Sequence, residues 1–386
     1  MPEDTKPLHI HCAVHGCTEW SGNFRSIIDT PEFQRMRSIR QLGIANLVYP
    51  CATHTRFEHS LGVGYVAGRI ADALAKAHPE RRVPADVLRL AGLCHDIGHG
   101  PLSHGFDRYM AGAPDGSVPA SHETRSEAIL KRMYETRPAV REAFSWEDIQ
   151  GACDLIVGRR RAYEPYVYDI LSNDALDADK LDYLVRDSMH TVKMQSIDID
   201  RIVRMCRVVD ERLSFCAPSL ILDVNNVVVM RHHMHTLVYQ HPCVRNLETM
   251  HVDMLRALRP DVSALDAFLR LTDSVTTPLY LEHQSRVASL TEAEVALARH
   301  LHDRIAERRL YRRVPEDHVP TEEETRSGGV VKDTSVVGSR TSPLLQARFH
   351  NKAGKRISDV DFPSVVPIAM RDEVVRTYAR DWSSPA

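Results

Sequence analysis

The chain has 386 residues, of which 43% are hydrophobic, and this length allows one large domain or two. Its formal net charge of −3 is small, so duplex nucleic acid is not the default partner, although basic clusters at residues 159–161 and 308–313 leave local contacts open. No stretch approaches the ~20 apolar residues of a membrane span, and the polar start contains no signal-peptide core. We therefore expect an intracellular protein, cytoplasmic or nuclear, without a membrane partner.

The first segments predict a strand and a helix. Histidine and cysteine alternate over residues 9–17, but their spacing fits no zinc finger, and a short strand that leads into a turn at Gly16 is the simpler interpretation. The eight cysteines of the chain form no Cys-x-x-Cys pair, so we expect reduced thiols. Residues 24–42 alternate apolar and basic side chains at helical spacing, and Thr30 or the preceding aspartate can cap a helix there, with Pro31 in its first turn.

The next part of the chain is predicted to consist of helices and short connections. Apolar residues at helical spacing indicate helices at 56–77, 85–95 and 122–134, with a broken helix after Pro101. The Gly- and Pro-rich loop at 111–119 is long enough to shift or to close over a substrate.

Residues 95–107 contain three histidines and two aspartates, which makes this stretch a candidate metal site. Adjacent His95 and Asp96 at a helix end can both turn toward one cation, and an imidazole with a carboxylate suits Zn, Mn or Fe better than Ca or Mg. The alternative is that the pair only hydrogen-bonds and caps a buried helix end. Two further ligands are available, His59 in an upstream helix and Asp179 in a downstream one. Such a site would leave positions open for water and a phosphate oxygen, as metal-assisted hydrolysis requires.

Two helical stripes carry the residue types of a nucleotide pocket. The first stripe consists of Lys180, Tyr183 and Asp187, and the second of Arg231, His235 and Tyr239, which Gln240 follows. Within each stripe the residues are three or four positions apart, so they share one face of a helix. Arginine suits phosphate, tyrosine a sugar or base face, and glutamine a base edge. Such a mix is also common on a solvated helix. The apolar residues Leu181, Leu184 and Val185 mark the other face of the first stripe as buried, so its polar face is expected to line a cleft.

The last part of the chain is predicted to be mixed. β-Branched residues at 208–229 suggest a small sheet, and an Ala-, Arg- and Leu-rich stretch at 292–309 suggests a helix. Residues 315–342 show little periodicity and are expected to be mobile or poorly ordered. A last α+β piece would contain residues 344–349 and 365–382.

Four motifs resemble those of the HD-domain phosphohydrolases, named for their His-Asp doublet. They are most similar to the deoxynucleoside triphosphate triphosphohydrolases that join a sterile-alpha-motif domain to an HD domain. The motifs are residues 28–37, 41–43, 56–65 and 91–101, and the resemblance runs from about residue 14 to about residue 314. We expect the sterile-alpha-motif domain itself to be absent.

The resemblance implies a mostly α fold, an HD-domain helical bundle with a smaller α+β C-terminal lobe. The expected division is a strand-and-turn leader at 1–24, the HD core at 25–264, and the C-terminal lobe at 265–386 with a flexible segment at about 315–342.

The same resemblance implies hydrolysis of deoxynucleoside triphosphates (dNTPs) at the α-phosphorus, which gives deoxynucleoside and inorganic triphosphate. The implied cofactor is a divalent transition metal, Fe, Mn or Zn, that binds an α-phosphate oxygen and lowers the pKa of a bound water, while Mg accompanies the nucleotide. The implied metal ligands are His59, His95, Asp96 and Asp179. His104, oriented by Asp107, and His122 are implied to handle protons, with His104 protonating the departing 5′ oxygen. Substrate contacts are implied for Gln41, Leu42, Arg56, His99, Lys180, Tyr183, Asp187, Arg231, His235, Tyr239 and Gln240.

The resemblance also implies a homo-oligomer, a dimer or a tetramer, that is regulated by nucleotides bound between its subunits. One site would bind GTP or dGTP, and a second site would bind a dNTP. The matching positions are Asp29, Gln34, Arg37, Arg308 and Arg312 for the guanine nucleotide and Val48, Arg201 and His241 for the dNTP. The chain departs from the family pattern at Leu8, His11, Pro218, Leu220 and Pro242, most of which replace basic residues. Each lost charge-assisted contact forfeits roughly 1.5–3 kcal/mol, so we expect weak dNTP activation. The alternative for the first-helix residues is that they merely cap and brace the helix.

Two other interpretations remain. HD clefts also carry out cyclic-nucleotide phosphodiesterase and 5′-nucleotidase reactions, against which the match of Gln41, Asp187 and Tyr239 to a deoxyribonucleotide pocket argues. The non-enzymatic alternative is a nucleic-acid-binding or scaffold protein with a relict site. Because every metal and catalytic position is filled, the sequence favours the enzyme.

Overall fold

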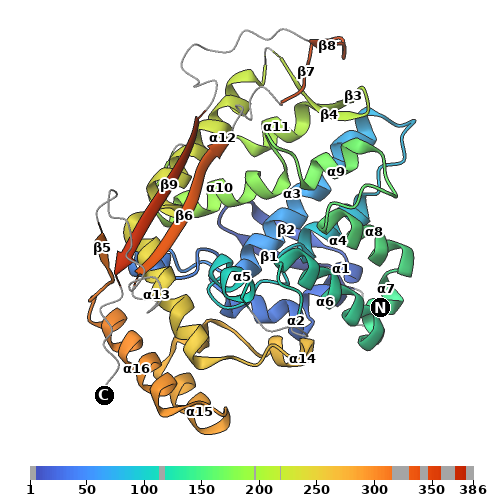
Figure 1. The fold of residues 1–386 in the computed structure, drawn as a ribbon. Coiled ribbons are helices and arrows are strands. Elements are labelled where there is room, and N and C mark those ends of the chain that lie inside the picture. The colour runs from blue at the N-terminus through green and yellow to red at the C-terminus, as the bar shows by residue number, and fades with distance from the viewer. Residues whose placement is uncertain are drawn as a thin grey trace.

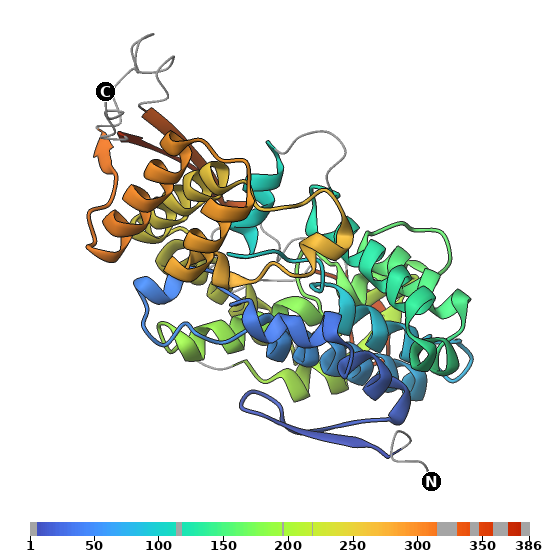
Figure 2. The ribbon, with the colours of Figure 1, turned by 90° about the horizontal axis from the view of Figure 1, so that it is seen from below.

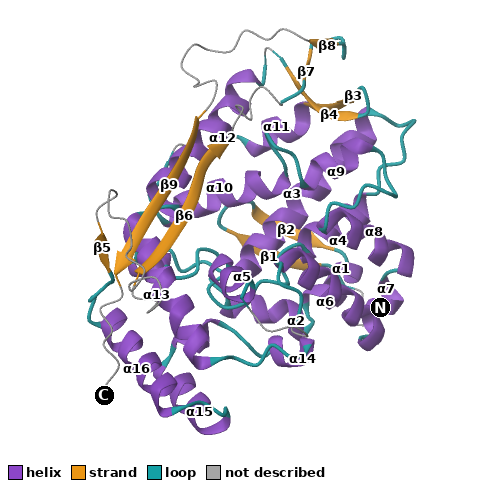
Figure 3. Cartoon of the chain, in the orientation of Figure 1, coloured by secondary structure: helices purple, strands orange, loops and turns teal. Residues whose placement is uncertain are grey.

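The structure is a computed structural model that describes residues 6–112, 118–194, 197–217, 219–314, 330–339, 347–357 and 370–379. Within this part the fold is mostly helical, with small sheets near the N-terminus, in the middle and near the C-terminus (Figure 1, Figure 3). This confirms the predicted class, a mostly α fold with a smaller α+β C-terminal part.

The helices are α1 (Gly22–Ile28), α2 (Pro31–Gln34), α3 (Arg56–Ala77), α4 (Ala85–Cys94), α5 (His104–Met110), α6 (His122–Thr136), α7 (Pro138–Ala143), α8 (Trp146–Ile156), α9 (Pro165–Leu171), α10 (Ala178–His190), α11 (Ile199–Met205), α12 (Ile221–Met234), α13 (Pro242–Leu258), α14 (Leu265–Phe268), α15 (Pro278–Val287) and α16 (Glu292–Ala306). A π-helical turn, His235–Tyr239, follows α12, and short 3₁₀ turns lie at Arg35–Ser38, Ala45–Leu47 and Asp273–Thr276. The strands are β1 (Leu8–Cys12), β2 (Gly16–Trp20), β3 (Cys206–Val209), β4 (Arg212–Cys216), β5 (Arg312–Val314), β6 (Val330–Ser339), β7 (Phe349–His350), β8 (Arg356–Ile357) and β9 (Met370–Ala379).

Helices α3 and α4 cross closely because glycines lie at their contact. A Cβ on Gly92 would be 2.8 Å from the Cα of Gly64, and a Cβ on Gly64 would be 2.8 Å from Leu93 Cγ. A side chain at either position would push the helices apart. At the start of α3, Glu58 accepts a hydrogen bond of 2.9 Å from the backbone N–H of Thr55, which completes a capping box. The sequence therefore fixes both where α3 begins and how near α4 lies.

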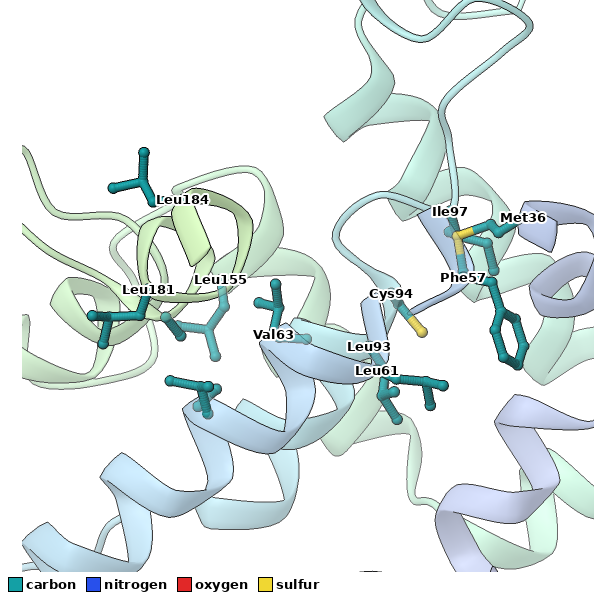
Figure 4. Close-up of a cluster of buried hydrophobic side chains, with 14 of the residues drawn as sticks. Met36, Phe57, Leu61, Val63, Leu93, Cys94, Ile97, Leu155, Leu181 and Leu184 are labelled. Atoms are coloured by element: carbon teal, nitrogen blue, oxygen red, sulfur yellow. The ribbon is translucent and has the colours of Figure 1, made fainter. Parts of the chain in front are cut away.

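Apolar side chains from α3, α4, α8 and α10 form a buried core around this crossing (Figure 4). Val63, Leu93, Leu155 and Leu181 are each at most 2% exposed. Burying one such side chain contributes about 1.5–3 kcal/mol. This core holds in place the helices whose polar residues form the candidate site.

The N-terminal predictions hold in part. A strand followed by a turn at Gly16 is confirmed, since β1 and β2 pair antiparallel on either side of that turn. The helix predicted at 24–42 is instead two short helices and a 3₁₀ turn, because α1 ends before Thr30. The Thr30 hydroxyl accepts a 3.2 Å hydrogen bond from the N–H of Phe33, and Pro31 is the first residue of α2.

The helices predicted at 56–77, 85–95, 122–134 and 292–309 correspond to α3, α4, α6 and α16, with ends that differ by three residues at most. The loop predicted at 111–119 lies largely outside the described residues.

The small sheet predicted at 208–229 is present only in its first half. β3 and β4 pair antiparallel, but the stretch that begins at Leu220 continues into α12 and not into a strand. The reason is helical spacing, because Leu220, Val224 and Val227 are all fully buried on one face of that helix.

The C-terminal segments join two different sheets. β7 pairs parallel with β4. β6 pairs antiparallel with β9 along a long ribbon, and β5 pairs with the other edge of β9 (Figure 1). Residues 330–339 are therefore a strand, where the sequence predicted a mobile segment; residues 315–329 and 340–342 of that segment lie outside the described part. The described portions of the last predicted α+β piece are strands alone. Because β7 joins a sheet from the middle of the chain, the division at residue 264 stays a prediction.

In the described part of the chain, no helix has both the length and the apolar character that crossing a membrane requires.

We expect a buried histidine in α13 to make stability depend on pH. His251 is 4% exposed, its Nδ1 lies 2.8 Å from the carbonyl oxygen of Leu247, and burial lowers its pKa from 6.5 to about 4. The unfolded chain binds this proton below pH 6.5 and the folded chain only below about 4, so the free energy of unfolding falls as pH drops through that window, by about 3 kcal/mol. Urea unfolding measures the free energy of unfolding at pH 7 and at pH 4.5. The difference between the two values should be smaller for His251→Gln than for the control His283→Gln, in which an exposed histidine is replaced. Equal differences would show that His251 is not the source of the pH dependence.

Candidate metal and active site

Two histidines meet where the start of α3 lies beside the end of α4. His59 Nδ1 is 2.8 Å from Asp182 Oδ2, and His95 Nδ1 is 2.8 Å from the carbonyl oxygen of Gly92. Each Nδ1–H can donate to its oxygen, which leaves both Nε2 atoms for another partner. Hydrogen bonds of this kind fix the ring orientation of metal-binding histidines. Among the described residues, His95 Nε2 is buried and has no hydrogen-bond partner.

Two carboxylates complete the predicted set of ligands. Asp179 Oδ1 lies 3.1 Å from His59 Nε2 and 3.7 Å from His95 Nε2, and the Asp96 oxygens lie 3.5 Å and 3.4 Å from the same two atoms. Metal–ligand bonds of about 2.1 Å place neighbouring ligand atoms about 3.0–3.4 Å apart, and the observed separations are at or slightly above this range. His59, His95 and Asp96 offer ligand atoms within 4.8 Å of one another, as one ion requires, and Asp179 lies close to the two histidines of this group. Two imidazoles with two carboxylates fit a divalent transition metal.

The charges around His59 favour a cation. Burial opposes protonation of its ring, but hydrogen bonds to Asp179 and Asp182 raise the pKa of His59 to about 10. Burial likewise opposes ionisation of Asp179, yet the contact with His59 and the charges of both nearby histidines hold the pKa of that carboxyl well below its ordinary value. A metal ion can supply the positive charge that this proton supplies, and its binding would release the proton.

Asp182 supports the site from the next turn of α10 and was missed by the sequence analysis. Besides His59, it accepts hydrogen bonds from Arg186, with Nη2 at 2.7 Å and Nε at 2.9 Å, and it lies 2.6 Å from His15 Nε2. Burial opposes its ionisation, but the Arg186 guanidinium and these hydrogen bonds hold the pKa of Asp182 well below its ordinary value. The one local feature of the sequence that could have indicated this role is its position three residues after Asp179, on the same face of the helix.

Arg56 lies inside the site and holds one of the carboxylates. Its guanidinium donates to Asp96 Oδ2, to Ser103 Oγ at 2.9 Å and to the carbonyl oxygen of Gln41 at 3.3 Å. It is 3% exposed and lines the cavity described below. The family resemblance implied a substrate contact for Arg56, whereas in the structure its nearest anion is Asp96.

A second cluster of histidines lies next to the first. Asp107 Oδ2 is 2.7 Å from His122 Nδ1, and Arg125 donates to the other oxygen. His104 Nδ1 is 3.7 Å from Asp107, beyond hydrogen-bond distance, so the carboxylate expected to orient His104 contacts His122 instead. His99 stacks on His122 with ring centroids 3.9 Å apart and 21° between the ring planes. An ion must lie near the plane of each imidazole that binds it, so these stacked rings suit proton transfer better than a second metal.

Both clusters open into a cavity of about 490 Å³, within the size range of ligand pockets. Its lining contains most of the predicted residues: Gln41, Leu42, Arg56, His59, His95, Asp96, His99, His104, His122, Asp179, Tyr183, Asp187, His235, Tyr239 and Gln240. The lining lacks two predicted cations. Lys180 Nζ binds Asp177 Oδ2 at 2.6 Å and the carbonyl oxygen of Asn173 at 2.8 Å, and Arg231 Nη1 is 3.4 Å from the carbonyl oxygen of Asp174.

The part of the cavity around Asp187 is polar. Tyr239 OH donates to Asp187 Oδ2 at 2.7 Å, and His54 Nε2 lies 2.7 Å from Asp187 Oδ1. The amide oxygens of Gln41 and Gln240 are buried without a hydrogen-bond partner among the described residues. Unpartnered buried acceptors of this kind are available to a ligand hydroxyl or amine. His54 was not predicted, and neither were the lining residues Arg245 and Glu248.

The predicted regulatory residues have three separate sets of neighbours within one chain. In the first helices, Asp29 pairs with Arg25 at 2.9 Å and Arg37 donates to Gln34 at 2.7 Å. Arg308 donates to the Leu47 carbonyl beside Val48, His241 contacts Tyr49, and Arg201 pairs with Asp223 at 3.3 Å. Arg312 is exposed on β5, and Pro218 lies outside the described residues.

Residues 56–187 match the HD domain family, and this range contains all four predicted metal ligands. The chain thus contains an HD domain, with the His95-Asp96 doublet at the end of α4.

Curated relatives extend the likeness over most of the chain. It is 31% identical over 342 residues to the deoxynucleoside triphosphate triphosphohydrolase SAMHD1 homolog of Dictyostelium discoideum, covering 86% of this chain and 64% of that protein. It is 32% identical over 352 residues to deoxynucleoside triphosphate triphosphohydrolase SAMHD1 of Homo sapiens, covering 80% and 55%. It is 33% identical over 355 residues to the protein of the same name from Gallus gallus, covering 79% of this chain and 55% of that protein. The chain therefore resembles SAMHD1, matches the HD domain family over residues 56–187, and spans 55–64% of the length of these relatives.

Proposed function

We propose that this chain hydrolyses dNTPs to deoxynucleoside and inorganic triphosphate, with a divalent transition metal held by His59, His95, Asp96 and Asp179. The observation that carries the proposal is the convergence of these side chains in a cavity of ligand size, where each of the two carboxylates has an oxygen 3.1–3.7 Å from the Nε2 atom of each histidine. Relatives named as deoxynucleoside triphosphate triphosphohydrolases support it.

A metal bound there would supply Lewis acidity to a phosphate oxygen and to an attacking water. Iron, manganese or zinc suits the mixed ligand set, and Mg is proposed to accompany the nucleotide. The histidine cluster handles protons. His122 is held by Asp107, and His104, whose side chain is 71% exposed, is free to protonate the departing 5′ oxygen.

The triphosphate needs cations, and the cavity presents few that are unpaired. Arg56 is bound to Asp96. Lys180 reaches the phosphates only by releasing Asp177 and the carbonyl oxygen of Asn173, and Arg231 only by releasing the carbonyl oxygen of Asp174. His99 adds little positive charge, because burial and the neighbouring Arg56 hold its pKa well below the ordinary value. Substrate binding is therefore proposed to reorient the two cations, which would stabilise the charge that builds in the transition state.

The polar part of the cavity is proposed to hold the sugar. Gln41 and Asp187 would satisfy a 3′-hydroxyl, and Leu42 would crowd a 2′-hydroxyl. A buried hydroxyl without a partner costs roughly 1–3 kcal/mol, so dNTPs should turn over about ten- to a hundredfold faster than the matching ribonucleotides.

This proposal is tested by incubating the purified protein with each dNTP and each NTP in Mg²⁺ and Mn²⁺ and separating the products. We expect deoxynucleoside and intact triphosphate. Release of pyrophosphate or single phosphate, or equal rates for dGTP and GTP, would instead mean another HD activity.

Regulation by guanine nucleotide, in a dimer or tetramer, is proposed from the resemblance of Asp29, Gln34, Arg37, Arg308 and Arg312. Adding GTP to the same assay, with sedimentation at each concentration, measures the response.

A further inference from the structure

The N-terminal hairpin of β1 and β2 lies at the edge of the molecule, below the helices in Figure 2. Its strands are short, with Cys12 paired to Gly16 next to the turn. Trp20 at the far end of β2 is 2% exposed and packs edge-on against Phe24 with ring centroids 5.9 Å apart. The hairpin is therefore fixed to the helices at its base, and its turn is the part that reaches the interior.

The turn places one histidine beside the support of the metal site. The side chain of His15 is 4% exposed, and its Nε2 lies 2.6 Å from Asp182 Oδ1. Asp182 itself is fully buried, and its other oxygen lies 2.8 Å from His59 Nδ1. A continuous line of hydrogen bonds therefore joins the hairpin turn to a metal-ligand ring, although 167 residues separate His15 from Asp182.

The remaining contacts of Asp182 leave His15 a distinct role. Arg186, from the same helix, binds both carboxylate oxygens, and its Nη2 also contacts Cys12 Sγ at 3.4 Å. The other partner of the carboxylate is the His59 ring, which it orients. His15 is therefore the partner that restrains Oδ1 from a separate element, the hairpin.

We propose that His15 is a positioning residue for the metal centre, whose Nε2–H fixes the Asp182 carboxylate in the orientation that holds the His59 ring. This inference rests on the metal centre of the proposed function, but not on its substrate or its reaction. Partners of this kind, one shell beyond the ligands, typically change metal affinity by 10–100-fold when they are replaced.

Two substitutions separate positioning from simple packing. In His15→Gln the side-chain amide nitrogen falls near the place of Nε2 and can still donate to Asp182, whereas in His15→Asn the amide is too short to reach it. Both variants keep a polar side chain of moderate size in the turn. The matched control is His9→Ala, because His9 is exposed on β1 of the same hairpin.

The experiment is a competitive chelator titration of Mn²⁺ without nucleotide, with urea unfolding of the metal-free protein alongside. We expect His15→Asn to bind Mn²⁺ about tenfold more weakly or worse, His15→Gln to stay within about threefold of the unmodified protein, and His9→Ala to be unchanged. The inference is overturned if His15→Asn binds Mn²⁺ as tightly as the unmodified protein, if Gln and Asn weaken binding equally, or if the unmodified protein binds no Mn²⁺. Because the assay contains no nucleotide, tight Mn²⁺ binding by a protein that hydrolyses no dNTP would refute the proposed function and leave this inference standing.

Discussion

Asp179→Ala is expected to abolish turnover and to empty the metal site while the helices remain folded. Asp179 lies 3.1 Å from His59 Nε2 and 3.7 Å from His95 Nε2, and α10 contributes it from outside the pair of helices that carries the other proposed ligands. Without it a metal held there would lose a ligand, and a bound water would lose its Lewis acid. That contribution is several kcal/mol, or about a thousandfold or more in rate.

Elemental analysis and a product assay on the same preparation measure both effects. Chelator treatment should bring the unmodified protein down to the level of the variant, and adding Mn²⁺ should restore only the unmodified protein. The control is Asp86→Ala, which removes a carboxylate whose side chain is 71% exposed in the first turn of α4. Full activity in a metal-free Asp179→Ala preparation would refute the metal assignment.

The sequence predicted best what depends on neighbouring residues. Helical spacing placed α3 and α4 almost to the residue, and the His95-Asp96 doublet is a local motif. The faces of helices were also predictable, but not the direction in which a flexible cation turns. Lys180 shares a face with Tyr183, yet its ammonium group turns back to Asp177 on its own helix start, where a short ion pair forms.

Contacts between distant segments could not be predicted from one sequence. His54 meets Asp187 across 133 residues, and nothing near either residue marks the pair. The strand β6 was different, because Val330, Val331, Val336 and Val337 are β-branched residues typical of strands. The polar residues around them hid this signal, and the pairing with β9 that stabilises the strand comes from 40 residues further on.

Gly62→Ala is expected to destabilise the fold by about 3 kcal/mol or more, because Asp182 occupies the space that a Cβ would need. That Cβ would lie 1.8 Å from Asp182 Oδ1 and 2.7 Å from Arg186 Nη2. The aspartate side chain is short and both of its oxygens are hydrogen-bonded, so it can move aside only by releasing its partners. Arg186, which is 1% exposed, would then keep only the more distant Glu58 carboxylate, 3.7 Å from its Nη1, as a counter-ion. Because His59 would lose its support as well, Mn²⁺ affinity should fall about 10–100-fold.

Gly68→Ala, one and a half turns later in α3, is the matched control. A Cβ there would lie 2.4 Å from Arg89 Nε and 2.6 Å from its Cγ, but the Arg89 side chain is 24% exposed and its partners Asp72 and Asp86 lie in solvent, so it can shift together with them. Alanine favours the helix over glycine by about 1 kcal/mol, so the free energy of unfolding of this variant should stay within about 1 kcal/mol of the unmodified protein. Urea unfolding of the metal-free proteins measures the difference directly. Equal urea midpoints of unfolding for Gly62→Ala and Gly68→Ala would show that the Asp182 carboxylate moves aside as easily as the partly exposed Arg89 side chain. The rigid support inferred for His59 would then be wrong.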